Sequence, residues 1–119
     1  MTIDLPFQLT NGNDGRGSKW FNSAKARKAY ESQLRLLGLT RKPFAGPVSV
    51  TVERVLGKGE RLWDSSSVGR GSYKELEDAL VACGFFVDDG PKWIVNTDFR
   101  QVVPEVRGGS GIRLTIKEL

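Results

Sequence analysis

The spacing of apolar residues along the chain is the feature that most constrains its fold. Four stretches alternate apolar and polar residues, which is typical of strands with one buried face. Two further stretches place apolar residues three or four positions apart, as amphipathic helices do. Together they follow the order β-α-β-α-β-β. This order predicts an α+β (mixed α/β) protein whose four-stranded mixed sheet is packed by two helices.

The expected strands cover residues 2–9, 47–56, 93–99 and 112–116. The first helix is expected to begin at Asn22 or Ser23 and to stop at Gly38, with an apolar stripe made of Ala26, Tyr30, Leu34 and Leu37.

Ser72 and Glu75 have the spacing of a capping box, which predicts that the second helix begins at Tyr73 and ends at Gly84. The sequence also predicts an extended segment at 61–64, a Ser/Gly-rich connector after it, and a short buried run at 85–87. In the third strand, Trp93, Val95, Thr97 and Phe99 occupy every second position and are expected to share one face.

The length and the rare residue types narrow the chemistry. The chain has 119 residues, which suits a single domain spanning 1–119. With one cysteine and no histidine, it excludes Ser-His-Asp catalysis and zinc sites built from His and Cys. Metal chemistry would have to use oxygen ligands, which favours Mg²⁺, Mn²⁺ or Ca²⁺. Neither a signal peptide nor a membrane-spanning run is evident, so we expect a soluble cytoplasmic protein.

The positive charge suggests a polyanionic partner. The net charge is +4 and the pI is about 9.5, which suits a nucleic-acid binder but also many ordinary small proteins. In the loop before the first helix, Arg16 and Lys19 lie beside Trp20, a combination suited to phosphate contact with base stacking. An equally good interpretation buries Trp20 in the core. The remaining candidate DNA-binding residues are Lys25, Arg27, Lys28 and, between two glycines, Arg70.

An ordered set of motifs spans residues 61–89. It begins with Arg-Leu-Trp-Asp at 61–64 and continues with Lys-Glu-Leu-Glu-Asp-Ala-Leu at 74–80. It ends with Gly-Phe-Phe-Val-Asp-Asp at 84–89. This order resembles the core of the RusA-type Holliday-junction resolvases. Nearer the N-terminus, Leu-Pro-Phe at 5–7, Gly-Arg-Gly at 15–17 and Ala-Tyr at 29–30 also fit, so the resemblance covers nearly the whole chain.

The resemblance implies a homodimeric, Mg²⁺-dependent endonuclease that cuts four-way DNA junctions in recombination and repair, with Mn²⁺ as a substitute metal. Asp64 matches the first metal-binding aspartate of the family and Asp89 the last, with Asp88 beside it. Lys74 matches the lysine needed for cleavage. The family's second aspartate falls on Ser66, a departure that also suggests a branched-DNA-binding protein of the same fold with little or no cleavage.

Elementary geometry allows these residues to meet. A helix of about eleven residues is ~16 Å long, and residues 84–88 can span a similar distance when extended. If that run folds back along the helix, Asp64, Lys74 and Asp89 converge. Each motif also has an ordinary interpretation: residues 88–91 as a turn, and Lys74 with Asp78 as a surface ion pair.

Overall fold

The computed structural model describes residues 1–10, 23–64 and 67–119. In chain order its elements are β1 (Thr2–Leu5), α2 (Ser23–Leu36), β2 (Val48–Val55), α3 (Ser67–Arg70), α4 (Tyr73–Ala82), β3 (Ile94–Val102) and β4 (Gly111–Glu118). The α+β architecture and the element order expected from the sequence are confirmed, with α3 as an added short turn of helix. Within the described parts of the chain, no helix is long and apolar enough to cross a membrane.

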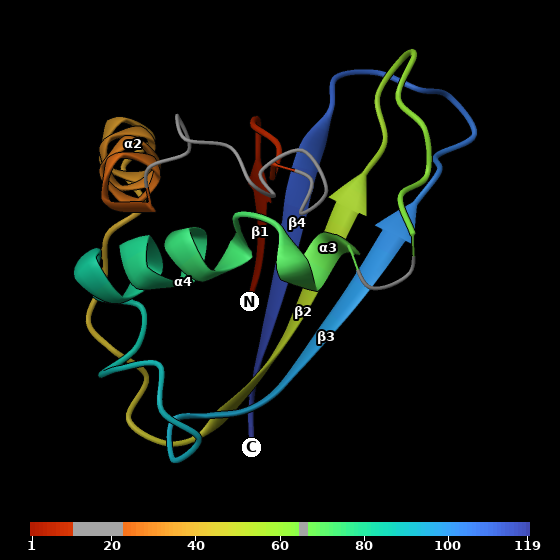
Figure 1. The fold of residues 1–119 in the computed structure, drawn as a ribbon. Helices are drawn as coiled ribbons and strands as arrows, with labels where there is room; N and C mark the ends of the chain where they lie inside the picture. Colours follow the sequence, from red (N-terminus) through yellow and green to blue (C-terminus); the bar gives the residue numbers. More distant parts are fainter. Residues whose placement is uncertain (11–22, 65–66) are drawn as a thin grey trace.

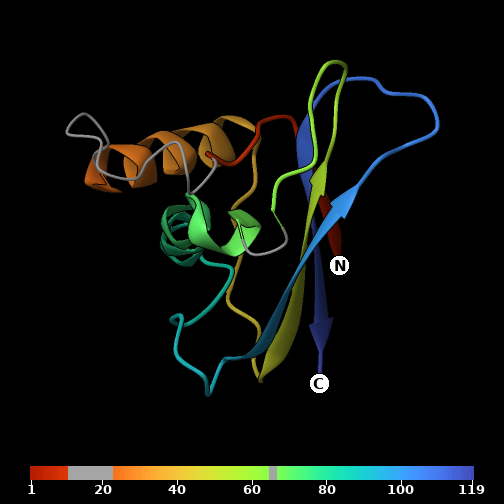
Figure 2. The same ribbon diagram turned by 45° about the vertical axis from the view of Figure 1, so that its right-hand side comes forward.

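The sheet is mixed, with strand order β1-β4-β2-β3. β4 pairs antiparallel with both β1 and β2, whereas β2 and β3 run parallel. A parallel pair needs a crossover, and here α3 and α4 provide it. Figure 1 shows this arrangement, and Figure 2 shows that α2 and α4 lie on the same side of the sheet. Among the described residues, no helix lies on the other face of the sheet.

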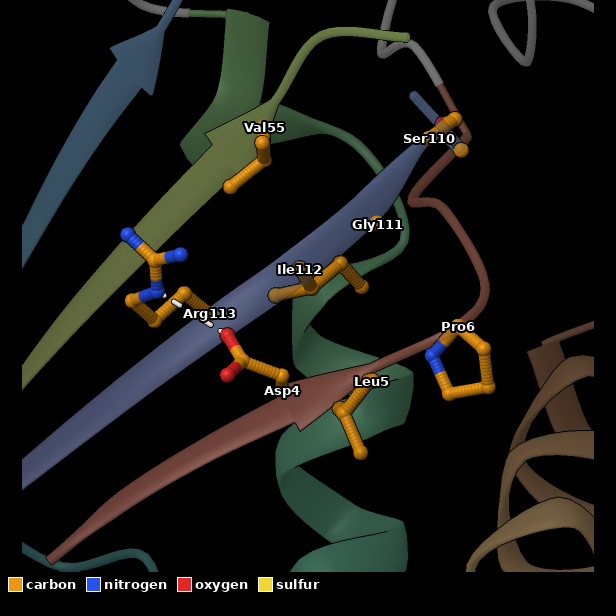
Figure 3. Close-up of a pocket in the computed structure, with 9 residues that line it drawn as sticks. Asp4, Leu5, Pro6, Val55, Ser110, Gly111, Ile112 and Arg113 are labelled. Carbon is orange, nitrogen blue, oxygen red and sulfur yellow. Dashed lines mark hydrogen bonds and ion pairs between the residues drawn. The ribbon is translucent and has the colours of Figure 1, made fainter. Parts of the chain in front are cut away.

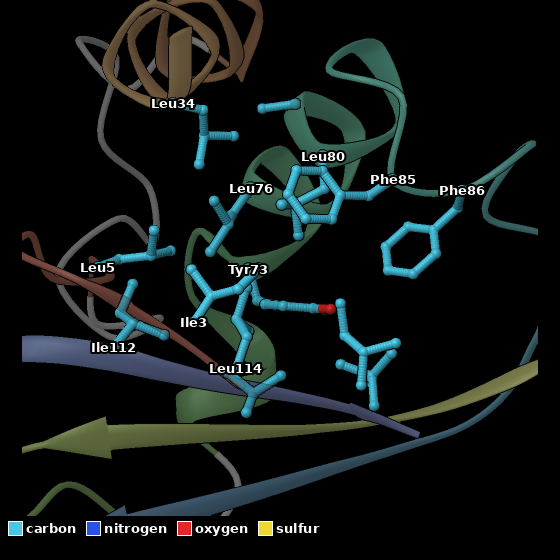
Figure 4. Packing of buried hydrophobic residues seen from close by; sticks show 14 of the residues in the cluster. Ile3, Leu5, Leu34, Tyr73, Leu76, Leu80, Phe85, Phe86, Ile112 and Leu114 are labelled. Atoms are coloured by element: carbon cyan, nitrogen blue, oxygen red, sulfur yellow. The ribbon is translucent and has the colours of Figure 1, made fainter. Parts of the chain in front are cut away.

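The hydrophobic core fills the space between the helices and the covered face of the sheet (Figure 4). Strict alternation along β2, as expected of a half-buried strand at 47–56, buries Val48, Val50 and Val52. Leu34 of α2 and Leu76 of α4 meet them from the helical layer, and both are fully buried. Burying a side chain of this kind contributes roughly 1.5–3 kcal/mol, so this layer defines the orientation of both helices.

Several expectations about individual apolar residues were wrong. β1 ends at Leu5, immediately before Pro6, because proline cannot donate the next ladder hydrogen bond. Leu37 lies beyond the end of α2 and is 46% exposed instead of extending its buried stripe. Val87 is also exposed, since the chain turns outward after Phe86.

The alternation expected in the third strand is interrupted by a bulge. Val48 pairs with Ile94, but the next residue of β2, Ser49, pairs with Asn96. The extra residue is Val95, which is exposed, while Ile94 is buried. After the bulge, Thr97 and Phe99 are half-buried as expected, so of these residues the extra residue of the bulge removes Val95 alone from the predicted face.

Two local features before α4 also differ from the expectation. Ser72 is the N-cap residue, but its side chain makes no capping hydrogen bond, so the predicted capping box is absent. Residues expected to form a Ser/Gly connector include the helix α3. An added Cβ at Gly69 would lie 3.1 Å from the Phe99 ring, so glycine allows α3 to pack closely against β3.

Candidate functional site

The side chain of Lys74 is surrounded by carboxylates on the outer surface of α4. Its ammonium forms an ion pair with Asp89, and it lies 3.0 Å from Asp78 Oδ1 and 3.7 Å from Glu77 Oε1. We call Lys74, Glu77, Asp78 and Asp89 the Lys74 cluster. The structure thus brings together two of the three proposed catalytic residues, Lys74 and Asp89. The helical pair Lys74–Asp78, the alternative interpretation, is present at the same time.

The chain between α4 and β3 returns Asp89 to the helix. Gly84 has a φ of +91°, and a Cβ there would lie 2.0 Å from the carbonyl oxygen of Arg41. Only glycine fits this close, left-handed turn. Phe85 and Phe86 are then buried, and the backbone N–H of Gly90 donates to Asp88 Oδ1 at 2.7 Å. Asp88 therefore stabilises the turn, as the ordinary interpretation expected, while its neighbour Asp89 faces Lys74.

The charges of the Lys74 cluster stabilise each other. The hydrogen bond from Lys74 lowers the pKa of Asp89, and the same bond raises the pKa of Lys74. Both groups therefore remain ionised at neutral pH. Because Lys74 and Asp89 side chains are 59% and 38% exposed, their pair contributes little to stability, at most about 1 kcal/mol.

Glu77 is a member of the cluster that sequence reasoning missed. Its side chain is only 13% exposed, and burial raises its pKa, an effect that Lys74 partly opposes. The spacing of three residues from Lys74 on one helix was the available signal. The sequence could not reveal that Glu77 is largely buried beside Lys74.

A hollow of about 490 Å³ extends from the cluster toward α2. It is lined by Arg27, Glu31, Asp78, Val81, Ala82, Asp88 and Asp89. Arg27, one of the proposed DNA-binding residues, therefore shares this hollow with Asp89. Lys25 and Lys28 are also exposed on α2. Of these three cations, Arg27 is the one that the hollow places beside the candidate site.

A second hollow, of about 330 Å³, lies at the junction of β1 and β4 (Figure 3). Its lining includes the apolar residues Leu5, Pro6 and Ile112. Asp4 and Arg113 also line it, and Arg113 Nε donates a hydrogen bond to Asp4 Oδ1 at 2.9 Å. None of the candidate residues lines it. Its polar side chains already have partners, since Asp4 pairs with Arg113 and Ser110 Oγ accepts a hydrogen bond from Gln8 Nε2.

Asp64 is exposed and is the last residue of the extended segment predicted at 61–64, which belongs to none of the described strands. In the described parts of the chain, Asp64 makes no hydrogen bond or ion pair with Lys74 or Asp89. The predicted convergence therefore holds for Lys74 and Asp89, and Asp64 does not join their ion pair.

Of the remaining proposed site residues, the structure describes the position of Arg70 alone. Arg70 ends α3, close in sequence to α4. Ser66, Arg16, Lys19 and Trp20 lie outside the described residues.

The donor set suits a hard cation, because Asp64 and Asp89 offer carboxylate oxygens. Within residues 1–10, 23–64 and 67–119, however, no three His, Cys, Asp or Glu side chains are arranged to hold a metal ion.

Comparison with known proteins adds no family assignment. No model of a known protein family matches the chain, and no curated protein shows significant similarity to it.

Proposed function

We propose that the protein is a metal-dependent endonuclease that cuts four-way DNA junctions, as its resemblance to the RusA-type resolvases implies. The observation that supports this most directly is the Lys74–Asp89 ion pair, because it joins two motif residues separated by 15 positions. A four-way junction has near two-fold symmetry and needs two coordinated cuts. A cytoplasmic homodimer with two matched sites fits that substrate.

In this proposal each residue has a distinct role. Asp64 and Asp89 would hold Mg²⁺, or Mn²⁺ in its place, and a metal bound there would supply an activated water molecule and positive charge for the leaving oxygen. The Lys74 ammonium adds positive charge near the scissile phosphate. Asp78 and Glu77 keep that ammonium at the surface of α4. Arg27 and Lys28, with Lys25 and Arg70, contact the phosphate backbone.

A second candidate function is a branched-DNA-binding protein that cuts poorly. The observation that favours it is Ser66, which stands where the family has its second aspartate. A serine hydroxyl is a neutral and weaker Mg²⁺ ligand than a carboxylate. On this alternative, Ser66→Asp lowers the metal concentration needed for half-maximal cleavage.

One assay separates the two candidates. A labelled four-way junction is incubated with the protein, with and without Mg²⁺ or Mn²⁺, and both the gel shift and the nicks are recorded. The endonuclease nicks the junction only with metal, and Asp64→Asn and Asp89→Asn each abolish nicking while they retain the shift. A shift without nicks in either metal identifies the binding protein.

Asp98→Asn is the matched control. Asp98 is exposed on β3 and lies 3.6 Å from Arg100, so this variant also breaks a surface ion pair but lies outside the candidate site. It is expected to nick as the wild type does. Normal nicking by Asp64→Asn or Asp89→Asn removes that residue from the site, and absence of both shift and nicks overturns the proposal.

A further inference from the structure

The side chain of Gln101 is bonded to the backbone of Trp63 at both ends of its amide. The Trp63 N–H donates to Gln101 Oε1 at 2.8 Å, and Gln101 Nε2 donates to the Trp63 carbonyl at 2.9 Å. A neighbouring strand would give a residue the same two kinds of bond. A side chain on β3 therefore holds both backbone groups of Trp63, in a segment that pairs with none of the described strands.

Arg54 completes this attachment. It is buried, and its Nη1 donates to Gln101 Oε1 at 3.0 Å and to the Arg61 carbonyl at 2.9 Å. Its guanidinium also lies 3.9 Å from the centre of the Trp63 ring. Because only an oxygen can accept from both Arg54 and Trp63, the amide of Gln101 is restricted to one orientation.

The sheet register explains why these side chains meet. Arg54 and Gln101 are registered partners on β2 and β3, on the face that is covered by helices further along the sheet. At this position the segment 61–64 supplies the cover instead, with Trp63 packed against the core.

Stability alone does not explain a buried cation here. Arg54 Nε has no hydrogen-bond partner, and buried ionic groups are often replaceable by apolar residues at no cost in stability. An apolar pair, however, could not hold the backbone of Arg61 and Trp63. The polar pair is therefore suited to fixing the position of that backbone.

We infer that Arg54 and Gln101 are positioning residues for Asp64. Asp64 directly follows Trp63, and consecutive Cα atoms are about 3.8 Å apart, so holding both peptide groups of Trp63 limits where Asp64 can lie. This inference rests on the proposed function, in which the Asp64 carboxylate binds the metal. The Arg54–Gln101 pair then supports this ligand indirectly, through the backbone of the residue before it, as outer-shell groups support ligands by direct hydrogen bonds.

Gln101→Met tests the inference because methionine has a similar length but no amide. We expect faster hydrogen exchange at the Trp63 amide, measured by NMR without metal or DNA. The metal concentration for half-maximal nicking should rise on the order of 10-fold to 100-fold, as for other outer-shell losses. Junction binding without metal should be unchanged, because neither residue is a proposed DNA contact.

Two comparisons sharpen the test. Gln101→Glu keeps the acceptor for Trp63 N–H and for Arg54 but loses the donor to the Trp63 carbonyl, so an intermediate metal requirement is expected. Asn96→Ala alters an exposed residue of the same strand and should change nothing. If Gln101→Met does not fold, Arg54→Lys replaces it. Lysine keeps the positive charge but cannot stack on the Trp63 ring while it donates to both Arg61 and Gln101.

The outcomes distinguish the inference from the proposed function. Faster exchange at Trp63 with an unchanged metal requirement means that the pair is merely structural, and the inference is wrong. Normal nicking by Asp64→Asn shows that the proposed role of Asp64 has failed. Metal-dependent melting shifts of the wild type and Gln101→Met give the same comparison without DNA. If the wild type neither nicks nor shows such a shift, the proposed function and this inference both fall.

Discussion

At the scale of single residues, Gly84 determines where the candidate site can form. It ends α4 in a left-handed conformation and lies against the backbone of Arg41, so the chain can turn and carry Asp89 back to Lys74. Gly38 ends α2 with a φ of +73°, but nothing lies within 4 Å of an added Cβ. A substitution at Gly38 therefore meets only the penalty of the left-handed backbone. A substitution at Gly84 meets that penalty and a steric overlap as well.

Alanine substitutions at three glycines should show this difference. Gly38→Ala is expected to lower the free energy of unfolding by about 1–2 kcal/mol, because only the left-handed conformation is penalised. Gly84→Ala should cost more than that, since its Cβ would also overlap the Arg41 carbonyl. Gly46→Ala has neither problem and should lie within about 1 kcal/mol of the wild type. Urea unfolding measures all three, and equal costs at Gly38 and Gly84 would contradict the steric argument.

At the scale of elements, hydrogen bonds tie α2 and the chain after β1 to the first turn of α4. The Thr10 N–H donates to Ser72 Oγ at 2.8 Å, and the Tyr30 hydroxyl shares a hydrogen bond with the same oxygen. Ser23 Oγ donates to Glu75 Oε1 at 2.8 Å. Ser72 and Glu75 thus connect segments distant in sequence, although their spacing suggested a local capping box.

A double-mutant cycle tests this role of Ser72. Ser72→Ala and Tyr30→Phe should each lower the free energy of unfolding by about 0.5–1.5 kcal/mol, the usual net value of a hydrogen bond. Because both remove the same Tyr30–Ser72 bond, the double variant should cost less than the sum of the two. Additive costs in urea unfolding would show that the two side chains are not coupled.

At the scale of the whole molecule, the helices divide the surface into two kinds of face. The exposed cations Arg27 and Lys28 lie on the helical side, which also carries the Lys74 cluster. Lys117 lies on β4 next to the buried Ile116, so its side chain is on the face of the sheet opposite to the described helices α2 and α4. If the helical side binds DNA, only its cations should contribute to the salt dependence of binding.

Junction binding should weaken steeply as salt rises. Counterion release by about six phosphate contacts gives a log–log slope of roughly −5. Arg27→Ala and Lys28→Ala should each make the slope shallower by about one unit, because each removes one phosphate contact. Lys117→Ala is the control and should leave the slope unchanged. A slope near zero, measured by fluorescence anisotropy, would point to a partner other than nucleic acid.

The sequence was informative about elements because their signals are local. Alternation predicted β2 and β4, and helical spacing with a following glycine predicted α2 and α4. It failed where packing overrode local pattern: the bulge at Val95, the exposed Leu37, and the short helix α3. Segment lengths alone allowed a fold-back of residues 84–89, and the structure contains the turn that brings Asp89 to Lys74.

The sequence by itself determined the fold class, the order of the elements and the acidic and basic residues available for chemistry. Only the tertiary structure decided which of them meet. It buried Glu77 beside Lys74 and placed Gln101 against the backbone of Trp63. The physical reason is that periodicity depends on neighbours a few positions away, whereas these contacts join residues brought together by the sheet register and by the turn at Gly84.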